Sequence, residues 1–237
     1  MKTHASILIA ALSTFGLAAS VQANVVNGDF SAGSTSWTSF GDVLFTGGNV
    51  TLTNASSAFE DDFPAVAGAF NISGTAAGDA NTANGLEEFS GLTIGDLDIS
   101  AGNTAFEGSA FKQTVAVNAG DTLTFDYVFL TNEGVNLDYA YFAINGTRFS
   151  FATVANATVP TSPYAFSTGP LNRAHVIGTT GTVTLAFGVT DIGGFDVTSA
   201  VTIDNINITP VPEPSAYAAL AGFATLGFVA LRRRRAA

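Results

Sequence analysis

The sequence predicts an all-β protein whose body is a single β-sandwich, with one short apolar segment at each end of the chain. Three observations support this fold class. Apolar and polar residues alternate over short stretches, turn-forming Gly, Asn, Asp and Thr separate these stretches, and helical periodicity is missing between residues 24 and 211. Many short strands separated by turns are typical of two sheets packed face to face.

The first 23 residues have the organisation of a secretory signal peptide. Lys2 supplies a positive charge, Ile7–Ala19 is apolar and has the length of a signal-peptide core, and Val21-Gln22-Ala23 is a small-residue cleavage site. We therefore expect a signal helix, export, and a mature chain that starts at Asn24. A transmembrane helix at this end is the alternative that the segment leaves open.

Three stretches of the body predict strands with one apolar face each. Apolar residues occupy alternate positions in Asp121–Leu130, in Gly181–Val189 and in Ala140–Ile144, and the last is followed by the hairpin pair Asn145-Gly146. Further strands are predicted at Val50–Thr53, Val66–Ile72, Phe106–Val117, Arg148–Val154, Arg173–Ile177 and Ala200–Ile208.

The glycine- and acid-rich stretch Gly74–Gly102 has no such regularity. We expect long loops there, with at most one strand. No linker divides the body, although a break near Gly102 stays open as an alternative. The predicted parts are thus a signal peptide over 1–23, one sandwich over 24–209 and a C-terminal segment over 210–237.

The last predicted strand contains a change of register. Val201 and Ile203 share one parity, whereas Ile206 and Ile208 share the other. Both pairs can face the core only if an extra residue is inserted between them, because side chains alternate strictly along a strand. We therefore predict a β-bulge at Asp204-Asn205.

The charge of the body excludes several classes of partner. Between residues 24 and 211 eighteen Asp and Glu stand against three basic residues, a net charge of −15 with His neutral. Nucleic acid and anionic membrane surfaces would be repelled, whereas Ca²⁺ ligation suits such a composition. The chain contains no cysteine, which excludes disulfides and thiolate metal sites.

The C-terminus has three parts in a fixed order. Val211-Pro212-Glu213-Pro214 should be extended, because two prolines restrict φ and remove backbone donors. Ala216–Leu231 contains no charged residue and would span roughly 24 Å as a helix, against a hydrocarbon core of roughly 30 Å. Four arginines follow. We expect a transmembrane helix over about 215–231 whose arginines stay cytoplasmic, and a soluble helix with a basic end is the alternative.

This tail resembles the PEP-CTERM sorting signal of Gram-negative bacteria, which is also catalogued as an ice-binding-protein C-terminal domain. The resemblance implies recognition by an exosortase at the inner membrane and sorting to the cell surface or extracellular matrix. It implies nothing about antifreeze activity. By this resemblance the recognition motif is Pro212, Glu213 and Pro214, and the retention signal is Arg232, Arg233, Arg234 and Arg235.

The two ends of the body resemble jelly-roll carbohydrate-binding modules. The opening Asn27-Gly28-Asp29-Phe30 is followed by Gly33 and Trp37, and the body closes with Ile203-Asp204-Asn205-Ile206. In such modules the first and last strands pair and often carry a structural Ca²⁺. The resemblance therefore implies Asp29 and Asp204 as calcium ligands, and a role for Asp204 as a solvated edge residue is the alternative.

The sequence does not predict an enzyme. His175 is the one histidine of the body, and no nucleophile elbow, zinc motif or phosphate-binding loop occurs. A carboxylate-pair glycoside hydrolase is a remote alternative, with Glu133 and Asp138 in a loop between two strong strands as the first guess.

We therefore expect a non-enzymatic surface or matrix protein that associates with exopolysaccharide. Tyr139 and Tyr141 share the face opposite Phe142 and are the predicted ligand-binding residues, because sugar binding needs aromatic surfaces with polar groups. Packing against the second sheet is the alternative for both, and Trp37 is expected in the core. The competing function is a Ca²⁺-dependent structural or adhesive matrix protein without sugar binding.

Overall fold

The computed structural model describes residues 24–56, 70–134, 137–195, 197–211 and 214–235 of the 237-residue chain. The predicted signal helix lies outside these residues. Pro212, Glu213 and most of the strand predicted at Val66–Ile72 also lie outside them. The described end of that predicted strand, 70–72, is not a strand.

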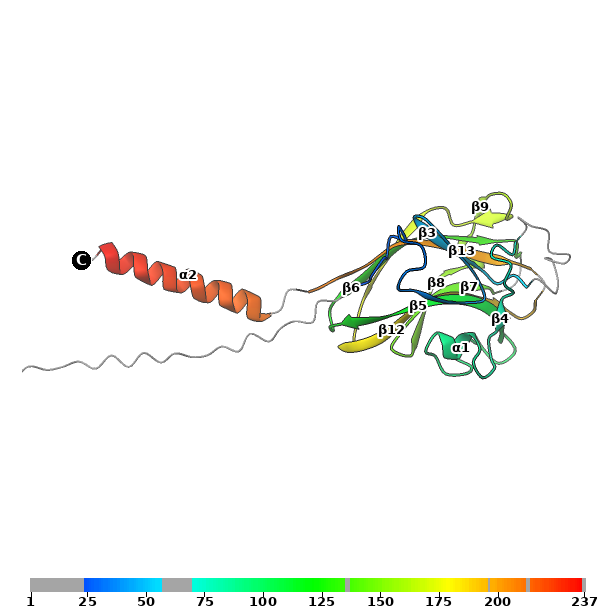
Figure 1. Cartoon of the computed structure of the whole chain (residues 1–237), viewed down its shortest axis with the longest axis horizontal. Coiled ribbons are helices and arrows are strands. Elements are labelled where there is room, and N and C mark those ends of the chain that lie inside the picture. The colour runs from blue at the N-terminus through cyan, green and yellow to red at the C-terminus, as the bar shows by residue number, and fades with distance from the viewer. Residues whose placement is uncertain (1–23, 57–69, 135–136, 196, 212–213, 236–237) are drawn as a thin grey trace, which may run out of the picture.

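Two antiparallel sheets pack face to face in the described body, which confirms the β-sandwich (Figure 1). The first, sheet A, has the strand order β1-β5-β12-β7-β8, with β4 paired to β5. Its strands are β1 (Thr38–Phe40), β4 (Gly78–Asp79), β5 (Ala105–Val117), β7 (Tyr139–Ile144), β8 (Thr147–Thr153) and β12 (Gly181–Ile192).

The second, sheet B, has the order β2-β3-β13-β6-β10-β9, with β11 paired to β6. Most long strands fall where they were predicted, whereas the short β1, β2, β9 and β10 were missed. The strands of sheet B are β2 (Asp42–Thr46), β3 (Asn49–Thr53), β6 (Thr122–Thr131), β9 (Val159–Pro160), β10 (Phe166–Ser167), β11 (Leu171–Val176) and β13 (Ser199–Thr209).

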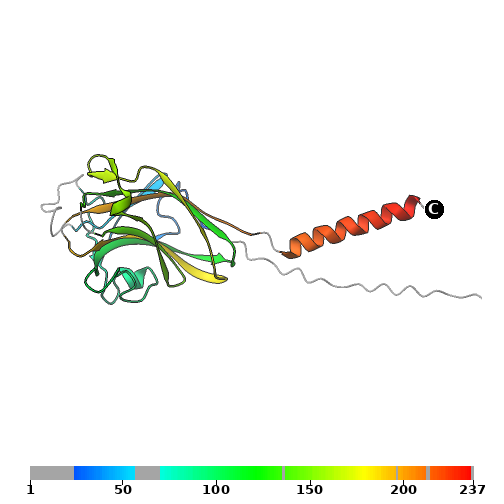
Figure 2. The ribbon, with the colours of Figure 1, turned by 180° about the vertical axis from the view of Figure 1, so that it is seen from behind.

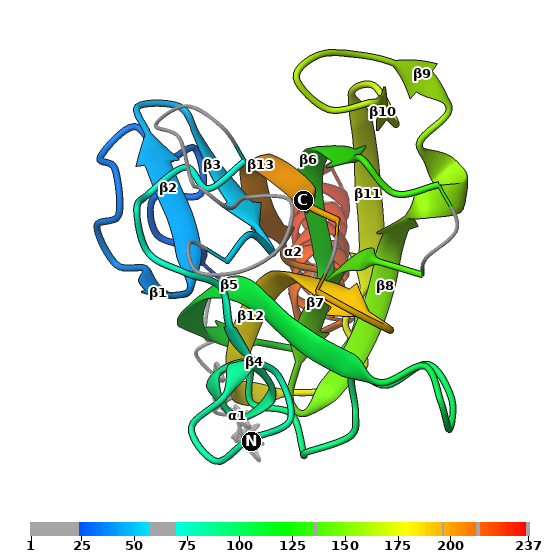
Figure 3. The same cartoon turned by 90° about the vertical axis from the view of Figure 1, so that its right-hand side faces the viewer.

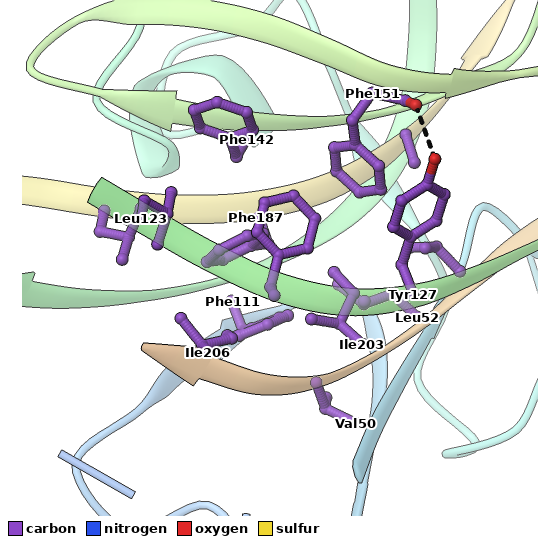
Figure 4. Packing of buried hydrophobic residues seen from close by; sticks show 14 of the residues in the cluster. Val50, Leu52, Phe111, Leu123, Tyr127, Phe142, Phe151, Phe187, Ile203 and Ile206 are labelled. Carbon is purple, nitrogen blue, oxygen red and sulfur yellow. Dashed lines mark hydrogen bonds between the residues drawn. The ribbon is translucent and has the colours of Figure 1, made fainter. Parts of the chain in front are cut away.

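Phenylalanine rings from both sheets form the centre of the core (Figure 4). Phe187 of β12 is fully buried and lies 5.0 Å from Phe125 of sheet B, measured between ring centroids, in an edge-to-face arrangement. On its own sheet it stacks on Phe111 at 5.4 Å. Such pairs add stabilisation beyond that of the apolar area that each ring buries. The predicted inward faces are confirmed, and Trp37 lies in this core as expected.

A segment that the sequence predicted as loops covers the outer face of sheet A. We call residues 70–104 the cover segment; it contains only β4 and the one-turn helix α1 (Leu86–Phe89) as regular elements. Figure 3 shows α1 and β4 on the side of β5 and β12 that faces away from β3 and β13. The absence of further strands was predicted, but the docking was not. Because of it, all six residues of β7 are buried.

The predicted bulge is present in β13. The pairing of β13 with β6 shifts register between Asp204 and Asn207, and Asn205 has a φ of +53°. Ile206 beyond the bulge donates its N–H to the Gly28 carbonyl at 2.9 Å. A Cβ on Gly28 would lie 2.0 Å from the Ile206 carbonyl oxygen, so only glycine permits this approach. The first turn of the body therefore packs on the bulge of its last strand.

The C-terminal segment forms the helix α2 (Pro214–Arg235), which lies outside the two layers (Figures 1 and 2). The helix was predicted; its membrane span is not supported. Among the described residues, no helix has the length and apolar character needed to cross a bilayer.

Candidate ligand-binding groove and sorting tail

Tyr139 and Tyr141 are not available to a ligand, so the prediction that they form an exposed sugar platform is wrong. Their exposed fractions are 1% and 0%. The Tyr141 hydroxyl is hydrogen-bonded to the Ser90 hydroxyl at 2.8 Å, and the Tyr139 hydroxyl donates to the Leu97 carbonyl. Burial raises the pKa of both phenols. The two residues do face away from Phe142, as predicted, but the cover segment occupies that side.

The ring of Tyr141 fits on sheet A because its neighbour has no side chain. Gly188 of β12 is its cross-strand partner, and a Cβ there would lie 2.5 Å from the tyrosine ring. The cover segment is held further by the buried Glu87, whose carboxylate accepts the N–H groups of Gly95 and Leu97 at 2.8 and 2.7 Å. Tyr139 and Tyr141 thus attach a loop to the sheet.

The two predicted calcium ligands have separate surroundings. The exposed Asp29 carboxylate accepts hydrogen bonds from the backbone and hydroxyl of Ser31, which lower its pKa. Asp204 lies on β13 directly opposite Asp126 of β6. In the part of the chain that the structure describes, no group of three or more Asp, Glu or His side chains is arranged to hold a metal ion. The calcium site implied by the resemblance therefore gains no support.

Glu133 and Asp138 are not a carboxylate pair in an open loop, because both are buried, with exposed fractions of 3% and 0%. Asp138 accepts hydrogen bonds from the Asn54 amide at 2.9 Å, the Ser199 hydroxyl at 2.8 Å and the Ile192 N–H at 3.0 Å. Burial, with a further contribution from the negative charge of Glu133, raises the pKa of Asp138 to about 7. Asp138 therefore joins the ends of several strands instead of facing a substrate.

His175 has a packing role. Its ring lies 4.3 Å from the ring of Phe149 and 5.0 Å from that of Phe142, measured between centroids. Burial and, to a lesser degree, the charge of Arg173 lower its pKa, so the neutral imidazole is favoured. The His175 ring of sheet B therefore packs against the rings of Phe142 and Phe149 of sheet A at one edge of the sandwich.

The outer face of sheet B contains a groove of about 500 Å³ that the sequence did not predict. We call it the β6–β13 groove, because these two strands form its floor and β3 and β11 its sides. The lining combines the apolar residues Val128, Pro170 and Leu171 with several polar residues. The lining residues are Asn49, Asp126, Tyr127, Val128, Pro170, Leu171, Asn172, Thr202, Ile203 and Asp204.

Asp126 is the polar group of the β6–β13 groove whose two side-chain oxygens are both hydrogen-bonded to neighbouring amides. Its two carboxylate oxygens accept hydrogen bonds from the side-chain amides of Asn172 at 2.7 Å and Asn205 at 2.8 Å. These bonds hold the pKa of Asp126 below its usual range, so the group is ionised at neutral pH. The bulge makes this arrangement possible, because it turns Asn205 toward β6.

Asp204 places a second carboxylate on the same face. Like charges directly opposite each other on neighbouring strands repel, and the amides around Asp126 offset part of that cost. Among the residues that line the groove there is no Lys, Arg or His. The arrangement presents hydrogen-bond acceptors, amides that both donate and accept, and an apolar wall, and it repels anions.

Sequence patterns predicted the position of two residues of this groove. The alternation in Asp121–Leu130 puts Asp126 on the face opposite the apolar one, and the parity change puts Asp204 at the bulge. They did not show that β6 and β13, which are about seventy residues apart in the chain, are neighbours in the sheet. Cross-strand pairing between distant segments leaves no local signal.

The sorting tail begins directly at the body. The Val211 N–H donates to the Asp121 carboxylate at 3.1 Å, and Asp121 is buried. Three residues later Pro214 starts α2, whose last turn contains Arg232, Arg233, Arg234 and Arg235. Pro212 and Glu213 lie outside the described residues.

Comparisons with known proteins concern both the whole chain and its C-terminal tail. A carbohydrate-binding module, TmCBM27, whose structure was determined in a study of specific mannan recognition, resembles the chain with a TM-score of 0.39 and 13% identity, over 78% of this chain and 95% of that one. A comparison with curated proteins found no match. Residues 210–235 match the family model of the PEP-CTERM protein-sorting motif, so the chain carries that motif at its C-terminus.

Proposed function

We propose that this protein is exported and sorted by an exosortase to the surface or extracellular matrix of a Gram-negative bacterium, where it acts without catalysing a reaction. The observation that carries this proposal is the PEP-CTERM motif at 210–235. The motif follows the last strand of the sandwich by only a few residues. The sandwich is therefore the cargo that the tail delivers.

Exopolysaccharide association is the second part of the proposal. The surface and matrix of such a cell are rich in polysaccharide, and the exported body has a β6–β13 groove with a polar lining and an apolar wall. A jelly-roll-like connection of the strands, as in carbohydrate-binding modules, belongs to this proposal as well. The Ca²⁺-dependent alternative is less favoured, because neither Asp29 nor Asp204 belongs to a group of three or more acidic or histidine side chains arranged to hold a metal ion among the described residues.

Removal of the tail tests the sorting step. A chain that ends at Val211 should still be exported, because its signal peptide is intact, but it should lose surface attachment in its native host. Immunolabelling of intact cells, with the culture medium and periplasm assayed in parallel, measures this distribution. Thr225→Ala in α2 is the matched control, since it lies between the two parts of the motif and should sort normally. Full surface attachment of the truncated chain would contradict the assignment.

Retention on the host's own exopolysaccharide tests the function of the body. The mature chain, starting at Asn24, is passed over immobilised polysaccharide with Ca²⁺ and with a chelator. We expect saturable retention that survives the chelator. Absence of retention in both conditions would favour the structural or adhesive alternative. Retention only with Ca²⁺ would show that binding requires the ion.

A further inference from the structure

We propose that the β6–β13 groove is the saccharide-binding site of this protein, and that it takes an uncharged glycan and rejects acidic ones. The inference rests on the proposed function, and it assigns to that function a place on the molecule and a chemical class of ligand. It replaces the buried Tyr139 and Tyr141 as the contact surface.

Pre-organisation of Asp126 supports hydroxyl recognition in the groove. A carboxylate accepts hydrogen bonds and donates none, so it suits the vicinal hydroxyls of a sugar, each of which has a proton to donate. Asp126 is held by Asn172 and Asn205 at 2.7 and 2.8 Å, and its position is set before a ligand arrives. A group that is already ordered loses little conformational entropy on binding.

The rest of the lining supplies what a sugar ring also needs. Pro170 and Leu171 are exposed at one side and present apolar surface to the C–H face of a pyranose. Asn49 and Thr202 lie across the groove and add donors and acceptors. Thr202 is held by a 2.9 Å hydrogen bond between its hydroxyl and that of Thr51. Polar groups and apolar surface in one groove match the two kinds of surface on a sugar.

Electrostatics decides the class of glycan. Asp126 and Asp204 bring two carboxylates to the floor of the groove, and the exported body has a net charge of −15. A uronate or a phosphorylated sugar would approach a negative field with no cation among the lining residues to pair with it. A neutral glycan meets no such repulsion.

Affinity electrophoresis of the mature chain, in native gels that contain a mannan, a β-glucan or polygalacturonate, tests the proposal. Mobility should fall in at least one neutral polysaccharide and stay unchanged in polygalacturonate. Asp126→Ala and Asn172→Ala should each weaken binding of the neutral polysaccharide by about tenfold or more. The first removes the charged acceptor, and the second removes an amide that donates to both Asp126 and the Phe125 carbonyl. Thr124→Ala is the matched control, since it lies on the same face of β6 outside the groove and should change affinity by less than about twofold.

The outcomes separate this inference from the proposed function. If the variants and the wild type bind equally, the glycan lies elsewhere, and the inference is overturned while exopolysaccharide association stands. Equal retardation by polygalacturonate overturns the class of ligand. If no neutral polysaccharide retards the wild type, the inference is overturned. If the host's exopolysaccharide also fails to retain the wild type, the proposed exopolysaccharide association is overturned as well. Thermal unfolding of each variant checks that the fold is kept. Asn172→Ala changes an exposed side chain, so this variant should keep the sheet folded.

Discussion

Phe187→Ala should lower the free energy of unfolding by about 4 kcal/mol, the middle of the range for truncating a fully buried aromatic ring. Phe187 has an exposed fraction of 0% and contacts the rings of Phe111 and Phe125, so its removal leaves a cavity between the two sheets. The densely packed neighbours can fill that cavity only in part. Urea unfolding of the mature chain, followed by circular dichroism, measures the change.

Phe166→Ala is the matched control for this experiment. Phe166 lies on the short strand β10 and is 39% exposed, so the same change of side chain removes far less buried area. We expect a loss of about 1 kcal/mol or less for this control. Similar losses for the two variants would contradict the placement of Phe187 at the centre of the core.

Stability should fall as the pH rises from about 4 to about 7, and Asp138→Asn should abolish that component. The pKa of Asp138 is raised from 3.8 to about 7 on folding, so in this window the folded state holds a proton that the unfolded state has released. The folded state therefore binds more protons, and stability falls by up to about 1.4 kcal/mol for each pH unit. Above about pH 7 both states are ionised and this contribution is constant.

The difference in unfolding free energy between wild type and Asp138→Asn isolates the effect. Asparagine cannot accept from Asn54, Ser199 and Ile192 as the carboxylate does, so the variant carries a constant loss of stability at all pH values. The amount by which the unfolding free energy of the wild type exceeds that of the variant should decrease between pH 4 and 7. Denaturant unfolding at four or five pH values measures this difference. A flat difference between pH 4 and 7 would mean that the pKa of Asp138 is not raised on folding.

Local patterns predicted the strands and their inward faces because alternation is a property of neighbouring residues. The parity change between Ile203 and Ile206 is the clearest example, since it required a bulge in any sheet that buries both. The same kind of reasoning failed for Tyr139 and Tyr141. Their alternation with Phe142 showed that they share the other face, but not whether water or protein covers it.

Asp138 illustrates the same limit for a charged residue. A carboxylate in a loop next to a strong strand is most often solvated, and nothing near it in the chain indicates burial. Its partners Asn54, Ile192 and Ser199 come from distant parts of the chain, and only the closed sandwich brings them within hydrogen-bonding distance.

The sequence by itself determined the sorting motif of this protein, its all-β class, its strand faces and its bulge. Each of these depends on residues adjacent in the chain: a linear sorting motif, an alternation, a change of parity. The tertiary structure alone decided the burial of Tyr139, Tyr141 and Asp138, and the meeting of Asp126 with Asp204. These depend on which strands become neighbours and where a long loop docks, which are set by the packing of the whole domain and not by any one segment.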